Sequence, residues 1–117
     1  MILGLKANAE ILKYARAASL LHGISLTPFT FGFFVELVKV VAEHGEKNPY
    51  TGNYTLSCTS GDLEKMLGFQ TNRLHSLFSQ LSKCGLLSFA ESNGVSVTKD
   101  RRFKSYFVSV DLSALLE

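Results

Sequence analysis

Thr59 to Phe89 reads TSGDLEKMLGFQTNRLHSLFSQLSKCGLLSF, and the order of capping residues, apolar residues and glycines in it decides the expected fold. Thr59 and Ser60 offer side-chain oxygens to a helix N-terminus, and the acidic residues after them favour the first turn of a helix. Apolar residues then recur at intervals of three and four up to Gly68, which can take the left-handed conformation that ends a helix. The sequence therefore predicts a short helix that starts near Ser60 and stops at Gly68.

A second, longer helix is expected after this glycine. Gln70 and Thr71 are candidate caps, and the helix runs to about Cys84 with four apolar residues at helical spacing, Leu74, Leu77, Phe78 and Leu81. Gly85 ends it, and an extended segment begins at Leu86. Two helices separated by a glycine and followed by a strand are therefore predicted.

Two further helices are predicted before this stretch. Residues 6–21 are amphipathic, with an apolar face formed by Ile11, Leu12, Ala15, Ala18 and Leu21. Thr27 and Pro28 are a good helix start, because threonine caps and proline fits the first helical position. This helix ends at Gly45, and its wide apolar surface makes it the expected core helix, with Phe31, Phe34, Val35, Val38 and Val41 or Ala42.

Strands are expected on both sides of the helix pair. A loop at residues 46–53 leads to a short strand at 54–58. After the pair, Ser92-Asn93-Gly94 is a strong tight-turn signal, and residues 103–110 form the third strand candidate. Either the Asn-Gly turn or the basic cluster at 98–102 forms the tip of this hairpin.

The end of the chain is predicted to be helical. Asp111 caps a short helix from Leu112 to Leu116, whose leucines pack on another part of the chain. The expected order is two helices, a strand, two helices, two strands and this final helix, within one domain.

This pattern resembles the skeleton of prokaryotic winged helix-turn-helix DNA-binding domains. The residues that carry the resemblance span about a quarter of the chain and are Asp62-Leu63, Leu67-Gly68, Leu74, Phe78, Leu81 and Gly85-Leu86-Leu87. The resemblance implies a mainly α fold with a small antiparallel β-sheet (α+β), extended by an N-terminal helix and a short C-terminal helix. Residues 1–117 then form a single winged-helix domain, with the N-terminal helix in 1–23, the winged-helix core in 27–104, and the last strand and C-terminal helix in 105–117.

One position departs from the family pattern. The family usually places a small residue, often alanine, four positions before the turn glycine, so that the two helices approach closely. This chain has Glu64 there. Either Glu64 points outward at a different helix crossing, or the register of the match is shifted.

Composition and charge favour a compact domain with one positively charged region. The chain has 117 residues, 46% of them hydrophobic, and a formal net charge of +2, which does not identify a nucleic-acid partner by itself. Between Met66 and Lys104, however, six lysines and arginines stand against two acidic residues, and the rest of the chain is net negative. This excess of positive charge lies on the expected second helix of the pair and on the hairpin after it, which is where binding of DNA phosphates would require it.

The second helix of the pair presents a polar face that suits DNA. At about 100° per residue, the side opposite its apolar face is centred on Asn72, Ser76, Ser79 and Lys83, with Arg73, His75 and Gln80 beside them. Arginine can bond to guanine, asparagine or glutamine to adenine, and serine to phosphates. The resemblance implies that the N-terminal half of this helix approaches the bases, with Gln70, Thr71, Asn72, Arg73 and Ser76 as readers.

The wing adds cations that can follow the DNA backbone or enter the minor groove, namely Lys99, Arg101, Arg102 and Lys104. We therefore expect sequence-specific binding of double-stranded DNA by a cytoplasmic protein. Such a protein would act as a transcriptional regulator or as a replication or maintenance factor.

Catalytic, metal and membrane roles are not expected. The three histidines, His22, His44 and His75, lie at helix ends or on an exposed face without a recognisable ligand motif. Cys58 and Cys84 are isolated and read as reduced, buried thiols. No cofactor and no small-molecule ligand is evident. The N-terminal charges interrupt any targeting segment, and the most apolar run, residues 27–42, is too short and too punctuated to span a bilayer.

A non-catalytic protein-protein adaptor is the alternative. Winged helices also serve as rigid adaptors, and the apolar faces of the N-terminal and C-terminal helices could form a homodimer. A two-fold dimer would place two reading helices on half-sites about one DNA turn apart. Salt separates the two functions, because phosphate contacts weaken steeply as salt rises and an apolar interface does not.

Overall fold

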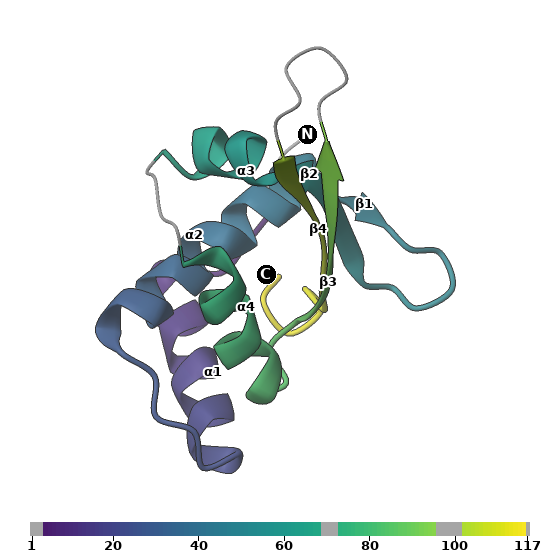
Figure 1. Cartoon of the computed structure of the whole chain (residues 1–117). Coiled ribbons are helices and arrows are strands. Elements are labelled where there is room, and N and C mark those ends of the chain that lie inside the picture. Colours follow the sequence, from purple (N-terminus) through teal and green to yellow (C-terminus); the bar gives the residue numbers. More distant parts are fainter. Residues whose placement is uncertain (1–3, 69–72, 96–101, 117) are drawn as a thin grey trace.

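The computed structural model describes residues 4–68, 73–95 and 102–116, with the backbone alone in 93–95 and 102–104. Within these ranges the chain forms four helices and a four-stranded antiparallel sheet (Figure 1), which confirms the mixed α and β class predicted from the sequence. The helices are α1 (Asn8–Leu21), α2 (Pro28–His44), α3 (Ser60–Leu67) and α4 (Leu74–Lys83). The strands are β1 (Glu46–Lys47), β2 (Tyr54–Thr59), β3 (Ser88–Val95) and β4 (Arg102–Val110).

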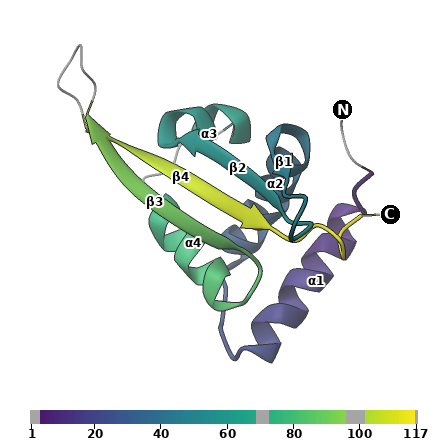
Figure 2. The same cartoon turned by 90° about the vertical axis from the view of Figure 1, so that its right-hand side faces the viewer.

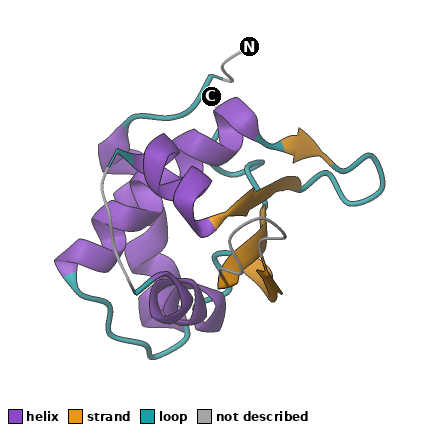
Figure 3. Cartoon of the chain, turned by 45° about the horizontal axis from the view of Figure 1, so that its top comes forward, coloured by secondary structure: helices purple, strands orange, loops and turns teal. Residues whose placement is uncertain are grey.

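The sheet has the strand order β1-β2-β4-β3. The last pair between β2 and β4 is Thr59↔Ser105, whereas β3 and β4 stay paired as far as Val95↔Arg102, three residue pairs further on. The β3–β4 hairpin therefore extends beyond β2, and Figure 2 shows it leading away from the helices. The helices gather on one side of the molecule and the strands on the other (Figure 3).

The central helix of the core is α2. It contacts α1, α3, α4 and β2, and nine of its residues are buried, including Phe33 and Phe34. Full burial of a phenylalanine stabilises a fold by about 1.5–3 kcal/mol. The predicted start of this helix is confirmed, since Thr27 Oγ1 accepts a hydrogen bond from the Thr30 N–H at 3.2 Å and Pro28 occupies the first helical position.

The helix pair in the stretch quoted first has the cap predicted for its first helix and both of the predicted glycines. Thr59 Oγ1 accepts a hydrogen bond from the Asp62 N–H at 3.2 Å. Gly68 ends α3 with a φ of +85°, and Gly85 follows α4 with a φ of +73°. Both angles would strain any residue that carries a Cβ. The second helix begins later than predicted, because α4 starts at Leu74 and Arg73 before it is not helical. The candidate caps Gln70 and Thr71 lie outside the described residues.

Glu64, which departs from the family pattern, is half-buried on α3. Its main-chain oxygen accepts a hydrogen bond from the Gly68 N–H at 2.9 Å, so the helix ends where the sequence predicted. α3 makes its main contacts with α2, β2 and β4 rather than with α4. Because α3 and α4 do not pack closely in the described chain, a small side chain is not required at this position.

The tight turn predicted at Ser92-Asn93-Gly94 is wrong. All three residues belong to β3, where their pairing partners in β4 are Ser105, Lys104 and Phe103. An Asn-Gly pair makes a two-residue turn only where the flanking strands stop, and here the ladder continues past it. The other candidate for the tip, residues 98–102, lies outside the described residues except for Arg102.

The C-terminal helix predicted at 112–116 is also wrong. Asp111 Oδ1 accepts hydrogen bonds from the Ser113 N–H at 3.0 Å and from Ser113 Oγ at 2.7 Å, and these bonds close a turn. Leu112 and Leu115 are buried in the core of the same chain. Five residues are too few to form a helix without strong packing on several sides. The predicted dimer helix at this end is therefore absent.

Two smaller differences concern the first half of the chain. The two residues of β1 pair with β2, and so short a strand has no alternating pattern that could have predicted it. The predicted apolar face of α1 is buried at Ile11 and Ala15 but not at Leu21, which is 83% exposed. Ser19 is buried instead, with its hydroxyl bonded to the main-chain oxygen of Arg16 at 3.0 Å.

Candidate nucleic-acid interface

The polar side of α4 is the first candidate surface. Its four apolar residues, Leu74, Leu77, Phe78 and Leu81, are buried as predicted, with Phe78 packed between rings of α2 and of the sheet. Ser76 and Lys83 are exposed on the opposite side, and Ser79 is half-buried beside them. No acidic residue occurs in the helix. The side chains in the middle of the exposed side are therefore short and polar, apart from one cation.

The flank of α4 that faces α2 carries two further predicted DNA-binding residues. Gln80 is half-buried, and its Oε1 accepts a hydrogen bond from Thr30 Oγ1 at 3.3 Å. Arg73 is exposed just before the helix, with its guanidinium carbon 5.9 Å from the centre of the Phe29 ring. Gln80 is thus half-buried and hydrogen-bonded within the protein, whereas Arg73 contacts Phe29 with its side chain exposed at the surface.

The flank that faces the sheet carries His75. His75 Nδ1 and Glu91 Oε2 are 2.9 Å apart, and the His75 ring meets Phe89 edge-on with a centroid separation of 5.7 Å. Glu91 also contacts the buried phenol of Tyr106, and burial, followed by the charge and hydrogen bond of Glu91, raises the pKa of that phenol. A carboxylate from β3 thus borders a helix that has none of its own.

The sequence-based interpretation missed Phe29, Thr30 and Glu91 as neighbours of this surface. Glu91 could have been predicted from the sequence. Residues two positions apart on a strand point to the same face, and Glu91 is two positions after Phe89. A strand that packs Phe89 against the helix also brings Glu91 to it. Nothing in the sequence indicates that Phe29 and Thr30 contact α4, since both belong to a helix more than forty positions earlier in the chain.

The remaining predicted DNA-binding residues divide into two groups. Arg102 and Lys104 belong to β4, in the part of the hairpin that extends past β2. The others lie outside the described residues, namely Gln70, Thr71, Asn72, Lys99 and Arg101. The described chain therefore brings together Arg73, His75, Ser76, Ser79, Gln80 and Lys83 around one helix.

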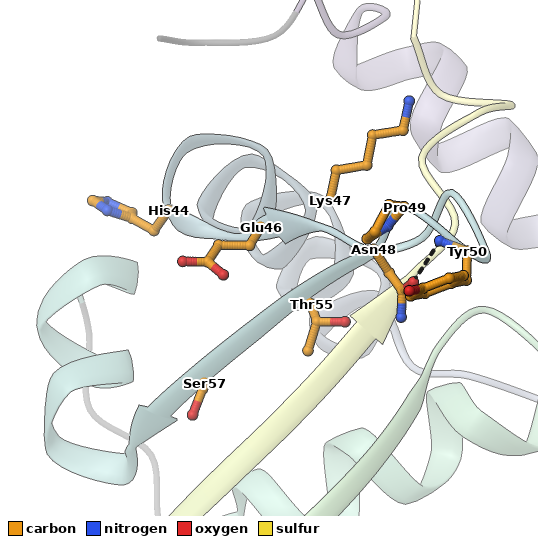
Figure 4. Close-up of a pocket in the computed structure, with 8 residues that line it drawn as sticks. All are labelled: His44, Glu46, Lys47, Asn48, Pro49, Tyr50, Thr55 and Ser57. Carbon is orange, nitrogen blue, oxygen red and sulfur yellow. Dashed lines mark hydrogen bonds between the residues drawn. The ribbon is translucent and has the colours of Figure 1, made fainter.

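A second candidate surface is a hollow of about 520 Å³ beside the β1–β2 hairpin (Figure 4). Its lining mixes positive, negative and neutral side chains: His44, Glu46, Lys47, Asn48, Pro49, Tyr50, Thr55 and Ser57. Asn48 Oδ1 already accepts hydrogen bonds from the N–H groups of Tyr50 and Thr51, at 2.8 and 3.3 Å. No single ligand charge is favoured in it.

A smaller hollow of about 410 Å³ adjoins the first and shares His44 and Ser57 with it. It contains Cys58, and burial, with a smaller contribution from the charge of Asp62, raises the pKa of that thiol to about 11. A thiol with so high a pKa stays protonated at neutral pH and is a poor nucleophile. Neither hollow therefore offers the arrangement of an activated cysteine.

Among the described residues, no group of three or more histidine, cysteine or acidic side chains is placed to hold a metal ion. In that part of the chain, no helix has the length and apolar character needed to cross a membrane.

Protein-family models, curated proteins and solved structures give no match to this chain. The choice between the two surfaces therefore depends on their own chemistry. The α4 surface combines an exposed helix face, an arginine and an adjacent hairpin, whereas the hollow beside β1 has mixed charge and partly satisfied polar groups.

Proposed function

We propose that this chain is a winged helix-turn-helix protein that binds double-stranded DNA in a sequence-specific manner. In this proposal the exposed side of α4 enters the major groove and the β3–β4 hairpin follows the DNA backbone. The protein then acts as a transcriptional regulator or as a replication or maintenance factor.

The order of the elements supports this proposal. A strand, two helices and a two-stranded hairpin follow one another as β2, α3, α4 and β3–β4, which is the order that the resemblance implies. The hairpin extends past β2, as a wing must in order to reach a ligand beyond the body of the domain.

The observation that carries the proposal is the acid-free exposed side of α4. Ser76 and Lys83 lie on it and Arg73 precedes it, all three exposed. The carboxylate of Glu91 lies on one flank, where it contacts His75 at 2.9 Å. Phosphates would meet no uncompensated acid on the helix itself, and an arginine at the start of a helix can bond to the edge of a guanine.

Specific roles follow for individual side chains. Arg73 reads a base, because a guanidinium offers two parallel donors to guanine. Ser76 and Lys83 bind phosphates, which fix the position of the helix without reading sequence. Arg102, at the start of β4, and its sequence neighbour Arg101, which lies outside the described residues, bind the DNA backbone in the same way.

The deciding experiment is selection of bound duplexes from a random pool, followed by affinity measurements as salt is raised. The wild-type protein is expected to enrich one sequence and to lose affinity steeply with salt. Arg73→Ala should weaken the selected site by about 1–3 kcal/mol and relax the preference at one position. Neutralising Arg101 and Arg102 together should weaken all duplexes alike.

Lys13→Ala is the matched control, since Lys13 is an exposed cation on α1. It removes the same charge as Arg73→Ala but should leave the selected site unchanged. The proposal is wrong if no sequence is enriched and no duplex binds at low salt.

One observation favours the adaptor alternative. Leu20 and Leu21, at the end of α1, are 82% and 83% exposed. Such neighbouring leucines can join a protein interface, and binding through them would respond little to salt. Leu20→Ser with Leu21→Ser should abolish that interface and leave DNA binding intact, so the same salt titration separates the two functions.

A further inference from the structure

The first turn of α2 touches α4 at two polar residues that lie on the same flank. Phe29 holds its ring under the guanidinium of Arg73, and Thr30 donates its hydroxyl to Gln80 Oε1 at 3.3 Å. The two contacts come from consecutive residues of one helix. The start of α2 therefore determines where this flank of α4 lies.

The Thr30 contact is part of a short hydrogen-bond chain. Thr30 is fully buried, and its Oγ1 lies 3.0 Å from Thr27 Oγ1 as well as 3.3 Å from Gln80. The Thr30 hydroxyl donates its one proton to Gln80 Oε1, so Thr30 Oγ1 must accept the hydrogen bond that it shares with Thr27. The Thr27 hydroxyl is therefore the donor in that bond. Thr27 Oγ1 also accepts the Thr30 N–H, so the cap of α2 and the contact with α4 are the same group of atoms. Chains of this kind hold their members in fixed positions.

The Phe29 contact has a different character, because both partners reach the surface. The Phe29 ring is 48% exposed and Arg73 is exposed. A cation over an aromatic ring at such a site gains about 0.5–1 kcal/mol. The guanidinium is planar and carries its N–H donors in a fixed fork, so a contact with a ring limits where these donors lie.

We propose that Phe29 is a positioning residue for DNA recognition, which holds the Arg73 guanidinium ready at the start of α4. This inference rests on the proposed function. The ring limits the conformations of a long side chain before DNA arrives, so less freedom is lost on binding. Thr27 and Thr30 hold the ring in place by fixing the first turn of α2 against Gln80.

The chain contains a matched contact on the same helix. The guanidinium carbon of Arg16 lies 5.9 Å from the centre of the Phe31 ring, the same separation as in the Arg73–Phe29 pair. Arg16 belongs to α1, not to α4. Phe31→Leu therefore removes an equivalent contact from α2 without touching Arg73.

The test compares Phe29→Leu, Phe29→Tyr and Phe31→Leu with the wild type on the selected duplex and on its single-base variants. Phe29→Leu should lower the discrimination at the base read by Arg73 by about 2- to 5-fold. Phe29→Tyr keeps the ring and should retain the discrimination of the wild type at this base. Phe31→Leu should also discriminate as well as the wild type. In an Arg73→Ala background, Phe29→Leu should have no further effect.

A second measurement reports the pair without DNA. In the free protein, the side-chain protons of Arg73 should be shifted upfield in the NMR spectrum by the ring current of Phe29. The shift should vanish in Phe29→Leu and persist in Phe29→Tyr. Thermal unfolding of each variant shows whether the fold is retained, which the half-exposed position of Phe29 favours.

The outcomes separate this inference from the proposed function. If the wild type selects a site and Phe29→Leu discriminates bases as well as the wild type, Phe29 does not position Arg73, while DNA binding stands. Equal losses on every duplex for Phe29→Leu and Phe31→Leu would indicate a general structural effect and also overturn the inference. If the wild type binds no duplex, both proposals fall.

Discussion

The two flanks of α4 are held by different kinds of interaction. Toward α2, the helix is bound by a buried hydroxyl and an uncharged amide, Thr30 and Gln80. Toward the sheet, it is bound by a pair of titratable groups, His75 and Glu91, with side chains 61% and 21% exposed. One flank therefore depends on a buried hydrogen bond between uncharged groups and the other on a more exposed hydrogen bond to a carboxylate, although the polar residues of both flanks look alike in the sequence.

A polar residue on a helix thus takes its role from the element beside it. Gln80 and His75 are both at the edge of the exposed face, and either could be assigned to a ligand. The neighbouring elements give each of them a partner within the protein. The exposed residues of this surface are Ser76 and Lys83 on the face itself and Arg73 at its start, where Arg73 also contacts Phe29.

The largest effect on the free energy of unfolding should come from Phe78, which packs against both α2 and the sheet. Phe78 lies 5.8 Å from Phe33 of α2 and 5.1 Å from Tyr106 of β4, measured between ring centres. Phe78→Ala should destabilise the fold by about 3–5 kcal/mol, because it leaves a cavity between these rings. Urea unfolding measures this, with Ser76→Ala as an exposed control on the same helix. Similar losses for the two variants would show that α4 is not anchored by its buried face.

The next effect should come from the α2 flank. Thr30→Val keeps the shape of the side chain but removes the hydroxyl that bonds to Gln80. We expect a loss of about 1–3 kcal/mol, since a polar atom loses its partner in a partly buried place. The loss should be the same at low and high salt and should shrink in a Gln80→Ala background. If Thr30→Val leaves the free energy of unfolding unchanged, the hydrogen bond between Thr30 and Gln80 does not hold α4 in place.

Alkaline pH should act through thiol and phenol groups of the sheet and through Cys84 at the end of α4, where burial also raises the pKa of the thiol. Burial raises the pKa of the Cys58 thiol from 9.0 to about 11, and burial with Glu91 raises the pKa of the Tyr106 phenol. Between about pH 9 and 11 the unfolded chain therefore binds fewer protons than the folded chain, and the free energy of unfolding falls as pH rises. Urea midpoints across this range should fall less steeply in Cys58→Ala.

Thr30→Val is the control for this pH series. It should lower the whole curve without changing its slope, because neither threonine nor glutamine titrates. Parallel curves for Cys58→Ala and the wild type would rule out a titrating group at this position.

The smallest effect should come from His75 and Glu91. A double-mutant cycle of His75→Ala and Glu91→Gln should give a coupling of about 0.2–1 kcal/mol, the usual range for an exposed pair that is ionic only when its imidazole is protonated. The coupling should decrease at high salt, unlike the coupling between Thr30 and Gln80. A coupling above 2 kcal/mol that ignores salt would remove the contrast between the two flanks.

The elements that the sequence predicted correctly are those with a local cause. The cap at Thr59, the cap and proline at Thr27-Pro28, and the glycines at 68 and 85 each act within a few residues, and each is present. The apolar spacing of α4 identified all of its buried residues for the same reason. Local chemistry determines these features before the chain folds.

The errors arise where distant partners decide. Asn93-Gly94 favours a turn locally, but pairing with β4 keeps it extended. Leu112 to Leu116 favours a helix locally, but the turn closed by Asp111 directs two leucines into the core. For the candidate site, residue types on α4 were predictable, whereas the contacts of Arg73 and Gln80 with α2 depend on tertiary packing.

The meeting of the two ends of the described chain has a consequence for its connectivity. Leu5 and Leu116 form an antiparallel bridge, and the Lys6 N–H donates to the Leu115 main-chain oxygen at 2.8 Å. A short peptide could therefore join these ends, and new termini could open between β1 and β2. Such a circular permutant would start at β2 and finish at β1, with every contact of α4 preserved. In this permutant α4 would precede α1 and α2 along the chain, and its folding would show whether α4 reaches its place without either of them being made first.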